Sequence, residues 1–433
     1  MGKLPLEGIR VTAISVVWAG PFAGSLLADW GAEVIRVESL HHFTVLTRGY
    51  PTIRPPKELV QARTTWSMAY PNWDPGEKPW NSFPIFQAHG RNKKSCTMDL
   101  RQPKGLEHFK NLVAKSDIVI ENNPPDTMEK MGITYEALKE IKPDIIMVSM
   151  PGFGCTGPYR DYRALGKNLD EAAGHTWLRG YRDMDPSSTS IILFSDASGG
   201  AHAAFAVLAA LRYRNRTGKG QFIDMAQVET IMPYLAEAIM DYTMNGRVQD
   251  ALGNRHPYMA PHGCYRCKGE DRWVVIAVNS EEEWQALCRV MDRPDLETDE
   301  RFADILNRHS HQDELDSIIE EWTIRFEHVE VMNRLQEAGV AAGAVLDDRD
   351  AYDDPHLKDR GFFQEITHPD VGTHLYPGLM WKASKTPNAI RTPPVRLGEH
   401  NEYVYKELLG VSDEEYEQLK REGHIGTEPA PGV

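Results

Sequence analysis

Residues 9–38 read IRVTAISVVWAGPFAGSLLADWGAEVIRVE and hold a complete strand–helix–strand unit. The apolar run at 9–17 is typical of a buried strand. The turn at Ala19-Gly20-Pro21 begins a helix that runs to Trp30, with apolar side chains at helical spacing, and 33–38 forms a second strand. Because a helical crossover joins strands that lie parallel in one sheet, this stretch predicts an α/β fold.

Beyond this unit, strand and helix patterns continue to alternate up to about residue 225. We expect helices over 104–115, 134–141 and 201–212, and strands over 117–121, 145–150 and 191–195. This succession predicts a parallel sheet with helices on both faces. The large domain, residues 1–225, is therefore expected to be Rossmann-like and to bind its ligand at the carboxyl ends of the strands.

The remaining domain boundaries follow changes of pattern along the chain. We expect a linker helix over 226–247, a smaller α/β domain over 248–345, a segment over 346–425 that returns to the large domain, and a disordered tail over 426–433. In the smaller domain, 264–267 and 273–278 should form a hairpin, and Ser280 with Glu283 should cap the next helix. Residues 40–81 carry six prolines and recurring tryptophans, which indicates a long ordered excursion.

Charge and cysteine content exclude several classes of function. With 48 basic and 63 acidic residues the net charge is −15, so we expect neither nucleic acid nor a membrane surface as a partner. The longest apolar stretch, near 203–211, is too short to span a bilayer, and no secretory signal is present. Five cysteines do not make a disulfide framework, so we expect a cytoplasmic location. Cys264 and Cys267 share an expected strand and point to opposite faces, so no metal site is expected.

The sequence lacks the usual cofactor and hydrolase motifs. Gly20 and Gly24 do not form G-x-G-x-x-G, and Phe22 occupies the place where a glycine must let a pyrophosphate approach. Neither a phosphate-binding P-loop nor a G-x-S-x-G nucleophile elbow is present. Glu38 ends the second strand, where a ribose-binding acid would lie, but the missing glycine argues against NAD or FAD.

Asp196 follows the apolar run 191–195 and precedes Ala197-Ser198-Gly199-Gly200 and a helical stretch. A carboxylate at this junction has two interpretations, which the local pattern leaves open. It caps the helix start, or it takes part in chemistry at a strand end, where α/β sheets bind their ligands. In both cases we expect the positive end of the helix to keep the carboxylate ionised.

Glycines and basic residues gather near other expected strand ends. Gly152, Gly154 and Gly157 either allow close backbone approach to a ligand or form a tight turn. An acidic chain with cations at strand ends suggests an anionic ligand, although scattered surface lysines are the alternative. These cations are Arg91, Lys93, Lys94, Arg101 and Lys130.

Taken together, the motifs resemble the class III CoA-transferase family, which includes formyl-CoA:oxalate and carnitine CoA-transferases. The resemblance covers nearly the whole chain, through the order of LEGIRV at 6–11, AGPFA at 19–23, GAEVIRVE at 31–38, NKKSCTMDL at 92–100, GFG at 152–154, SDASGG at 195–200, TGKGQ at 217–221 and LGEH at 397–400. It implies an enzyme without a tightly bound cofactor, for which acyl-CoA and a carboxylic acid are the substrates.

The resemblance also implies roles for single residues. Asp196 falls on the position of a nucleophile that forms a mixed anhydride with the acyl group and then an aspartyl-CoA thioester. The residues that match the CoA contacts of the family are Val17, Trp18, Ala19, Met98, Arg101, Asn122, Asn123, Lys130 and Met131, and Arg36 is a further basic candidate.

Two departures from the family pattern bear on the substrate. Trp18 replaces a glutamine beside the thioester, which suggests a more apolar acyl pocket, and Ser39 replaces a basic residue, which puts one phosphate or adenine contact in doubt. Together with the tryptophans of 40–81, Trp18 suggests a bulky or aromatic acceptor, as in a benzylsuccinate CoA-transferase with succinyl-CoA as donor, or a carnitine-like acid. Packing within the loop is the alternative explanation of these tryptophans.

Other functions and assemblies stay open at this point. The family includes racemases that remove an α-proton with a His–Asp pair; that pair is missing near 166–168, although Asp170 and His175 lie close by. A CoA-binding subunit without activity is a third possibility. By resemblance we expect an interlocked homodimer, or a heteromer with a related subunit.

Overall fold

Six parallel strands form the central sheet of the protein, in the order β3-β2-β1-β4-β5-β6. They are β1 (Arg10–Ile14), β2 (Glu33–Glu38), β3 (Lys93–Thr97), β4 (Ile118–Glu121), β5 (Ile146–Ser149) and β6 (Gln221–Asp224). This is the strand order of doubly wound nucleotide-binding folds. The predicted fold class, a Rossmann-like parallel sheet in an α/β protein, is confirmed. The computed structural model describes residues 3–64, 68–387 and 389–433.

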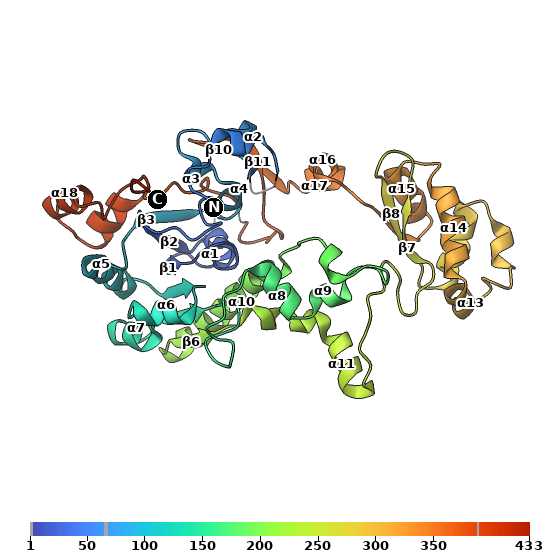
Figure 1. Cartoon of the computed structure of the whole chain (residues 1–433), viewed down its shortest axis with the longest axis horizontal. Coiled ribbons are helices and arrows are strands. Elements are labelled where there is room, and N and C mark those ends of the chain that lie inside the picture. Colours follow the sequence, from blue (N-terminus) through green and yellow to red (C-terminus); the bar gives the residue numbers. More distant parts are fainter. Residues whose placement is uncertain (1–2, 65–67, 388) are drawn as a thin grey trace. The chain divides into compact units, whose positions relative to one another are not determined.

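Alternating side chains of the strands pack against helices on opposite faces of the sheet. Val11 and Ala13 of β1 belong to one apolar core, which includes α1 (Ala19–Asp29) and α10 (Phe194–Thr217). Ile14 belongs to the other, which includes α5 (Pro103–Ala114) and α18 (Asp413–Arg421). These helices can be followed in Figure 1. Both faces are covered, as is usual for a parallel sheet.

The direction of winding changes between β1 and β4, which lie side by side. From β1 the chain proceeds through β2 to β3 on one side, and β4, β5 and β6 lie on the other side. Open α/β sheets bind their ligands at the carboxyl ends of the two strands that flank such a switch point. Here those ends lead into Ser15 and Asn122.

Short elements complete the chain. The helices are α2 (Lys57–Gln61), α3 (Pro79–Ser82), α4 (Pro84–His89), α6 (Pro125–Lys130), α7 (Tyr135–Ile141), α8 (Gly166–Ala172), α9 (His175–Leu178), α11 (Ala236–Asn245), α13 (Ile305–Ser310), α16 (Asp348–Asp353), α17 (Pro355–Asp359) and the π-helix η7 (Tyr403–Leu408). The 3₁₀ turns are η2 (Pro71–Trp73), η3 (Pro186–Ser188), η4 (Gln227–Thr230), η5 (Met232–Leu235) and η6 (Pro294–Glu297), and the strands β10 (Phe363–His368) and β11 (Gly372–Pro377) form a hairpin.

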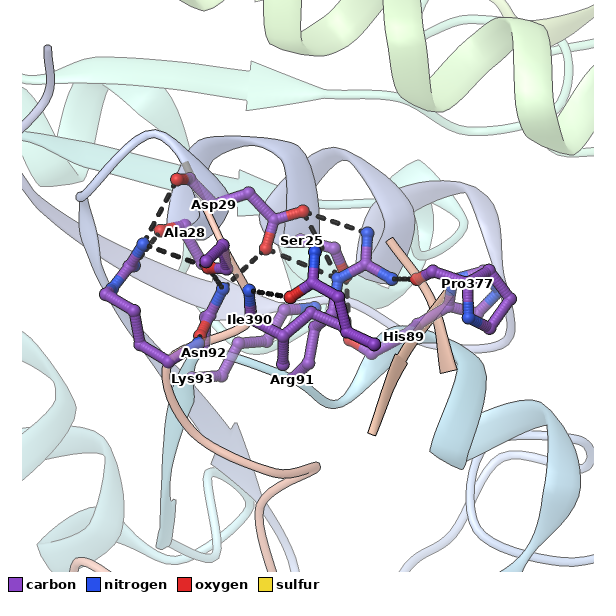
Figure 2. A network of polar contacts seen from close by, with 12 residues as sticks. Ser25, Ala28, Asp29, His89, Arg91, Asn92, Lys93, Pro377 and Ile390 are labelled. Carbon is purple, nitrogen blue, oxygen red and sulfur yellow. Dashed lines mark hydrogen bonds and ion pairs between the residues drawn. The ribbon is translucent and has the colours of Figure 1, made fainter. Parts of the chain in front are cut away.

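The chain forms two compact units, and the C-terminal segment belongs to the first. This unit contains residues 3–175, Ile191–Met240 and Asp359–Val433. Figure 2 shows how Asp29, at the end of α1, lies among Arg91 and Asn92. Arg91 Nη2 donates to Asp29 Oδ2 over 2.9 Å, and Asn92 Nδ2 donates to Oδ1 over 2.7 Å. Arg391 from the returning segment donates to the backbone oxygen of Asp29 over 3.2 Å, so the segment is fixed at the end of α1.

The second unit contains Thr176–Ser190 and Asp241–Lys358. Its antiparallel strands β7 (His262–Arg266), β8 (Trp273–Ala277) and β9 (Ala341–Ala344) pack with α12 (Glu281–Val290), α14 (Gln312–Thr323) and α15 (His328–Glu337). The predicted hairpin and the cap of α12 are confirmed, because Ser280 Oγ accepts the Glu283 N–H. The detailed domain boundaries stay predictions.

Three expected elements are wrong. The run 191–195 is no strand: Ile191 and Ile192 are half exposed, and α10 begins at Phe194. Of the helix expected over 226–247, only the part at Ala236–Asn245 forms, as α11; the 3₁₀ turns η4 and η5 precede it, around Pro233, which has no N–H to donate. The tail over 426–433 is ordered, since the Ala430 N–H donates to the Leu40 oxygen over 2.9 Å.

Candidate functional site

Asp196 lies in the first turn of α10, where its side chain is buried. It does not cap this helix. Asp170 of α8 does so, because its carboxylate accepts the backbone N–H groups of Phe194 over 3.1 Å and Ser195 over 2.9 Å. The capping interpretation of Asp196 is therefore wrong. The same contacts give Asp170 a structural role at the start of α10.

The Asp196 carboxylate instead faces the start of α1. The backbone N–H of Ala19 donates a hydrogen bond to it. Gly166 lies so close that a Cβ atom there would stand 1.9 Å from Asp196 Oδ2, a distance that only glycine avoids. Burial raises the pKa of Asp196 to about 6; the Ala19 hydrogen bond opposes this shift and the charge of Asp170 adds to it. The expected effect of the helix start is thus outweighed by desolvation.

The turn between β1 and α1 is held by side chains from distant parts of the chain. The Asn122 amide accepts from the Val16 N–H over 2.8 Å and donates to the Val16 oxygen over 2.9 Å. Thr47 Oγ1 accepts the Val17 N–H over 3.0 Å. Val17 has a φ of 59°, which is unfavourable for a β-branched residue and tends to mark functional turns. The turn places Trp18 and Ala19 at the start of α1, next to Asp196.

A cleft opens at the carboxyl ends of β1, β2 and β4, at the switch point. Five of the predicted CoA-binding residues line it: Arg36, Met98, Arg101, Asn123 and Met131. Ser15, Val16, Ser39, His42 and Thr47 are among its other lining residues. A larger cavity within the second unit contains none of the predicted site residues.

The other predicted residues lie around this cleft in different roles. Val17 lines a small void next to the cleft, with Arg36 and Thr47. Trp18 packs against His89, with ring centroids 5.1 Å apart. Asn122 supports the turn rather than the cleft wall. Lys130 is exposed and pairs with Asp126 over 2.9 Å, four residues earlier on α6.

Glu38 is unavailable to a ribose. Arg48 donates to its two oxygens over 2.6 and 2.8 Å, and Ser95 Oγ donates over 2.7 Å. The neighbouring guanidinium groups hold the pKa of Glu38 at about 2 despite its burial. Arg36 contacts the same carboxylate over 3.4 Å, but its Nε has no hydrogen-bond partner among the described residues. A cation that lines the cleft thus keeps a free donor.

Sequence reasoning missed Thr47 and Glu121, and it did not predict the contacts of Gly166 with Asp196 or of Asp170 with the start of α10. Glu121 ends β4 fully buried, accepts the Asn123 N–H over 2.7 Å and contacts the Ser149 hydroxyl. Burial raises its pKa to about 7. Its place at the end of a buried strand was a usable signal, whereas Thr47 and Asp170 lie outside any motif and act through tertiary contacts.

The tryptophans of 40–81 do not line the cleft where the structure describes them. Trp80 is buried against Leu40 and Leu397, and Trp73 packs on a cluster around Phe83. Trp66 lies outside the described residues. Packing therefore explains Trp73 and Trp80. Among the residues that the structure describes, no three His, Cys, Asp or Glu side chains could share a metal ion, and no helix has the length and hydropathy to cross a membrane.

Comparisons with known proteins agree with this architecture. A family model described as CoA-transferase family III matches residues 6–401. The chain is 32% identical to a succinyl-CoA–D-citramalate CoA-transferase of Chloroflexus aurantiacus over 96% of this chain and 97% of that protein. It is also 32% identical to the beta subunit of a succinyl-CoA–L-malate CoA-transferase of the same species, over 96% and 97%. A crystal structure of a CAIB/BAIF family protein from Brucella suis superposes with a TM-score of 0.79 at 30% identity, covering 94% of this chain and all of that one.

Proposed function

We propose that this protein moves CoA from succinyl-CoA to a second dicarboxylic acid. The chain belongs to CoA-transferase family III and is thus a CoA-transferase. The relatives named above pair succinyl-CoA with citramalate or malate, which are short dicarboxylic acids. Trp80 is buried and Trp73 is partly buried against other loop residues, so neither supports a bulky aromatic acceptor. We therefore prefer a short dicarboxylic acceptor to a benzylsuccinate-type or carnitine-like one.

In the proposed mechanism Asp196 is the nucleophile. One carboxylate oxygen attacks the thioester carbonyl of succinyl-CoA, the C–S bond breaks, and CoA thiolate leaves a succinyl–aspartyl anhydride. The thiolate then attacks the aspartyl carbonyl and expels succinate, which gives an aspartyl-CoA thioester. The acceptor carboxylate attacks the carbonyl of this thioester, and the C–S bond breaks, which releases CoA thiolate and leaves an acyl–aspartyl anhydride. The thiolate then attacks the acyl carbonyl of this anhydride and expels the Asp196 carboxylate. Asp196 is regenerated as the new acyl-CoA forms.

The surroundings of Asp196 are the observation that carries this proposal. With a pKa of about 6, about nine-tenths of the carboxylate is ionised at pH 7, so it can attack. Burial keeps water from the anhydride, which hydrolyses readily. The Ala19 N–H at the start of α1 is a fixed donor beside the reacting oxygens, where it can stabilise an oxyanion.

We place CoA along the turn that joins the two parts of the site. Its nucleotide end lies in the cleft at the ends of β1, β2 and β4, and its pantetheine arm follows Val16 to Ala19 toward Asp196. The position of the cleft at the switch point and the strained, doubly held turn support this path.

The test is a covalent adduct. The purified chain is incubated with succinyl-CoA, and its intact mass and peptide map are measured. We expect an adduct on the peptide that contains Asp196. Asp196→Asn should lose the adduct and slow transfer at least about 1,000-fold, while CoA binding persists. Glu121→Gln, which changes another buried carboxyl group, should keep the adduct. An Asp196→Asn enzyme that still transfers CoA would disprove the mechanism.

A further inference from the structure

The loop after β2 presents a histidine to the cleft. Ser39 Oγ accepts the backbone N–H groups of His41 over 3.0 Å and His42 over 3.2 Å, which closes a tight turn. The two imidazoles take different positions. His41 Nε2 contacts the Gly423 oxygen over 3.1 Å, whereas the His42 ring lines the cleft. The turn thus places His42, rather than His41, at the cleft.

His42 meets a second basic group at this rim. Arg101 Nη1 lies 3.2 Å from Nδ1 and 3.1 Å from Nε2 of the His42 ring. Within the described part of the chain, no carboxylate forms an ion pair with either side chain. Asp99, which lines the same cleft, accepts the backbone N–H of Arg101 over 3.2 Å. Desolvation and the charges of Arg101 and His41 lower the pKa of His42, although Asp99 acts in the opposite direction.

The cleft therefore holds more positive than negative groups that are free to bind. Arg36 lines the same cleft, is 3% exposed, and keeps its Nε–H without a partner among the described residues. Glu38, the acid at the end of β2, is already engaged by Arg48. Burying a donor without a partner is costly, so an anionic ligand with several acceptor oxygens suits this arrangement.

We propose that His42, together with Arg101, binds the 3′-phosphate of CoA. The inference rests on the proposed function, which makes CoA the substrate. In nucleotide-binding sheets of this strand order the ribose lies at the end of β2, whereas the diphosphate lies over the turn that follows β1. The 3′-phosphate is attached to that ribose, and the loop at 39–42 directly follows β2. His42 is thus placed for the phosphate that distinguishes CoA from dephospho-CoA.

The proposal is tested by the affinities of CoA and dephospho-CoA for the full-length chain, measured by titration calorimetry. At pH 6 we expect the wild-type protein to bind CoA about tenfold more tightly than dephospho-CoA, the value of one charge-assisted hydrogen bond. His42→Ala should lose most of this preference without weakening dephospho-CoA binding. His41→Ala is the matched control and should retain the preference.

The pH dependence adds an independent readout. Only protonated His42 adds a positive charge, so the preference of the wild-type protein for CoA should fall between pH 6 and pH 8. His42→Lys should keep the preference at both pH values, because lysine stays charged. Arg101, Asp99, His41, Arg36 and Glu38 are the charged and titratable groups around this position. The phosphate itself, with a second pKa of about 6, gains negative charge over this interval and therefore acts against the expected fall.

The proposal is overturned by a wild-type protein that binds both ligands equally, or by a His42→Ala protein whose preference for CoA is unchanged, including one that weakens toward both ligands by the same factor. The failure of the proposed function is distinguishable from these. A wild-type protein that binds neither ligand and forms no adduct with succinyl-CoA contradicts the function itself, whereas normal transfer with an unchanged preference in His42→Ala contradicts this inference alone.

Discussion

At the scale of single residues, Gly166 gives the most direct probe of the Asp196 environment. A Cβ atom at position 166 would stand 1.9 Å from Asp196 Oδ2 and 3.2 Å from Leu193, so the carboxylate must move. We expect Gly166→Ala to slow transfer at least about 100-fold, because a displacement of about 1 Å has effects of this size. CoA binding in the cleft should change little. The measurement is kcat together with the Kd of CoA.

The control for this substitution is Gly24→Ala. Gly24 is also helical, in α1, but its Cβ would lie 3.4 Å from the nearest atom, Lys93 Nζ, which is ordinary contact. This variant should retain its activity. If both variants lose activity equally, the loss reflects damage to the fold, and the close approach of Gly166 to Asp196 has no special role.

The pKa of Asp196 predicts how the first chemical step depends on pH. Burial raises this pKa to about 6, so the reactive carboxylate is lost as the pH falls through 6. Adduct formation with succinyl-CoA alone should be constant above pH 7 and about tenfold slower at pH 5. Using the half-reaction avoids the titration of the acceptor acid. Glu121, with a pKa of about 7, is the other buried carboxyl group that could cause such a pH dependence. A midpoint near pH 7 that disappears in Glu121→Gln would contradict the assignment to Asp196.

At the scale of elements, α1 serves the site with its first turn and anchors the fold with its last. Asp29 is buried and accepts from Arg91 and Asn92 (Figure 2). Asp29→Ala leaves the guanidinium of Arg91 buried without a carboxylate, so we expect the free energy of unfolding to fall by about 3 kcal/mol. Chemical denaturation measures it. Asp74→Ala breaks the exposed Lys57–Asp74 pair and should cause no measurable change. Equal effects of the two substitutions would contradict the anchoring role.

The elements also show which parts of the fold the sequence predicts and which it does not. The strands at 9–17 and 33–38 were predictable because buried parallel strands are continuous apolar runs. The run at 191–195 has the same composition, yet Ile191 and Ile192 are half exposed. Asp196 was expected between a strand and a helix start, but it lies inside the first turn of α10, and its surroundings were not predicted. Its neighbours Asp170, Gly166 and Ala19 come from separate segments, and no local pattern records which carboxylate caps α10.

At the scale of the whole molecule, the site depends on segments that are far apart in the sequence. Thr47, Asn122 and Asp170 each hold a backbone segment that no local element fixes. The ordered tail reaches the same unit, since Arg54 Nη2 donates to the Pro429 oxygen over 2.9 Å. Such contacts form only after the chain has closed long loops, which is why local patterns did not predict them.

An exposed apolar surface on α10 leads to a prediction about assembly. Phe205 is 71% exposed and Tyr234 is 59% exposed; His202, three residues before Phe205, contacts the Tyr234 ring at a centroid distance of 6.3 Å. Exposed apolar patches of this kind mark contact surfaces, and we propose that a second copy of the chain covers this one.

Phe205→Glu would place a charge on this surface, so we expect a smaller mass in light scattering after gel filtration. Leu306→Glu, at a residue that is 76% exposed on α13 of the second unit, should leave the mass unchanged. A wild-type protein that is already monomeric would contradict the proposed homodimer.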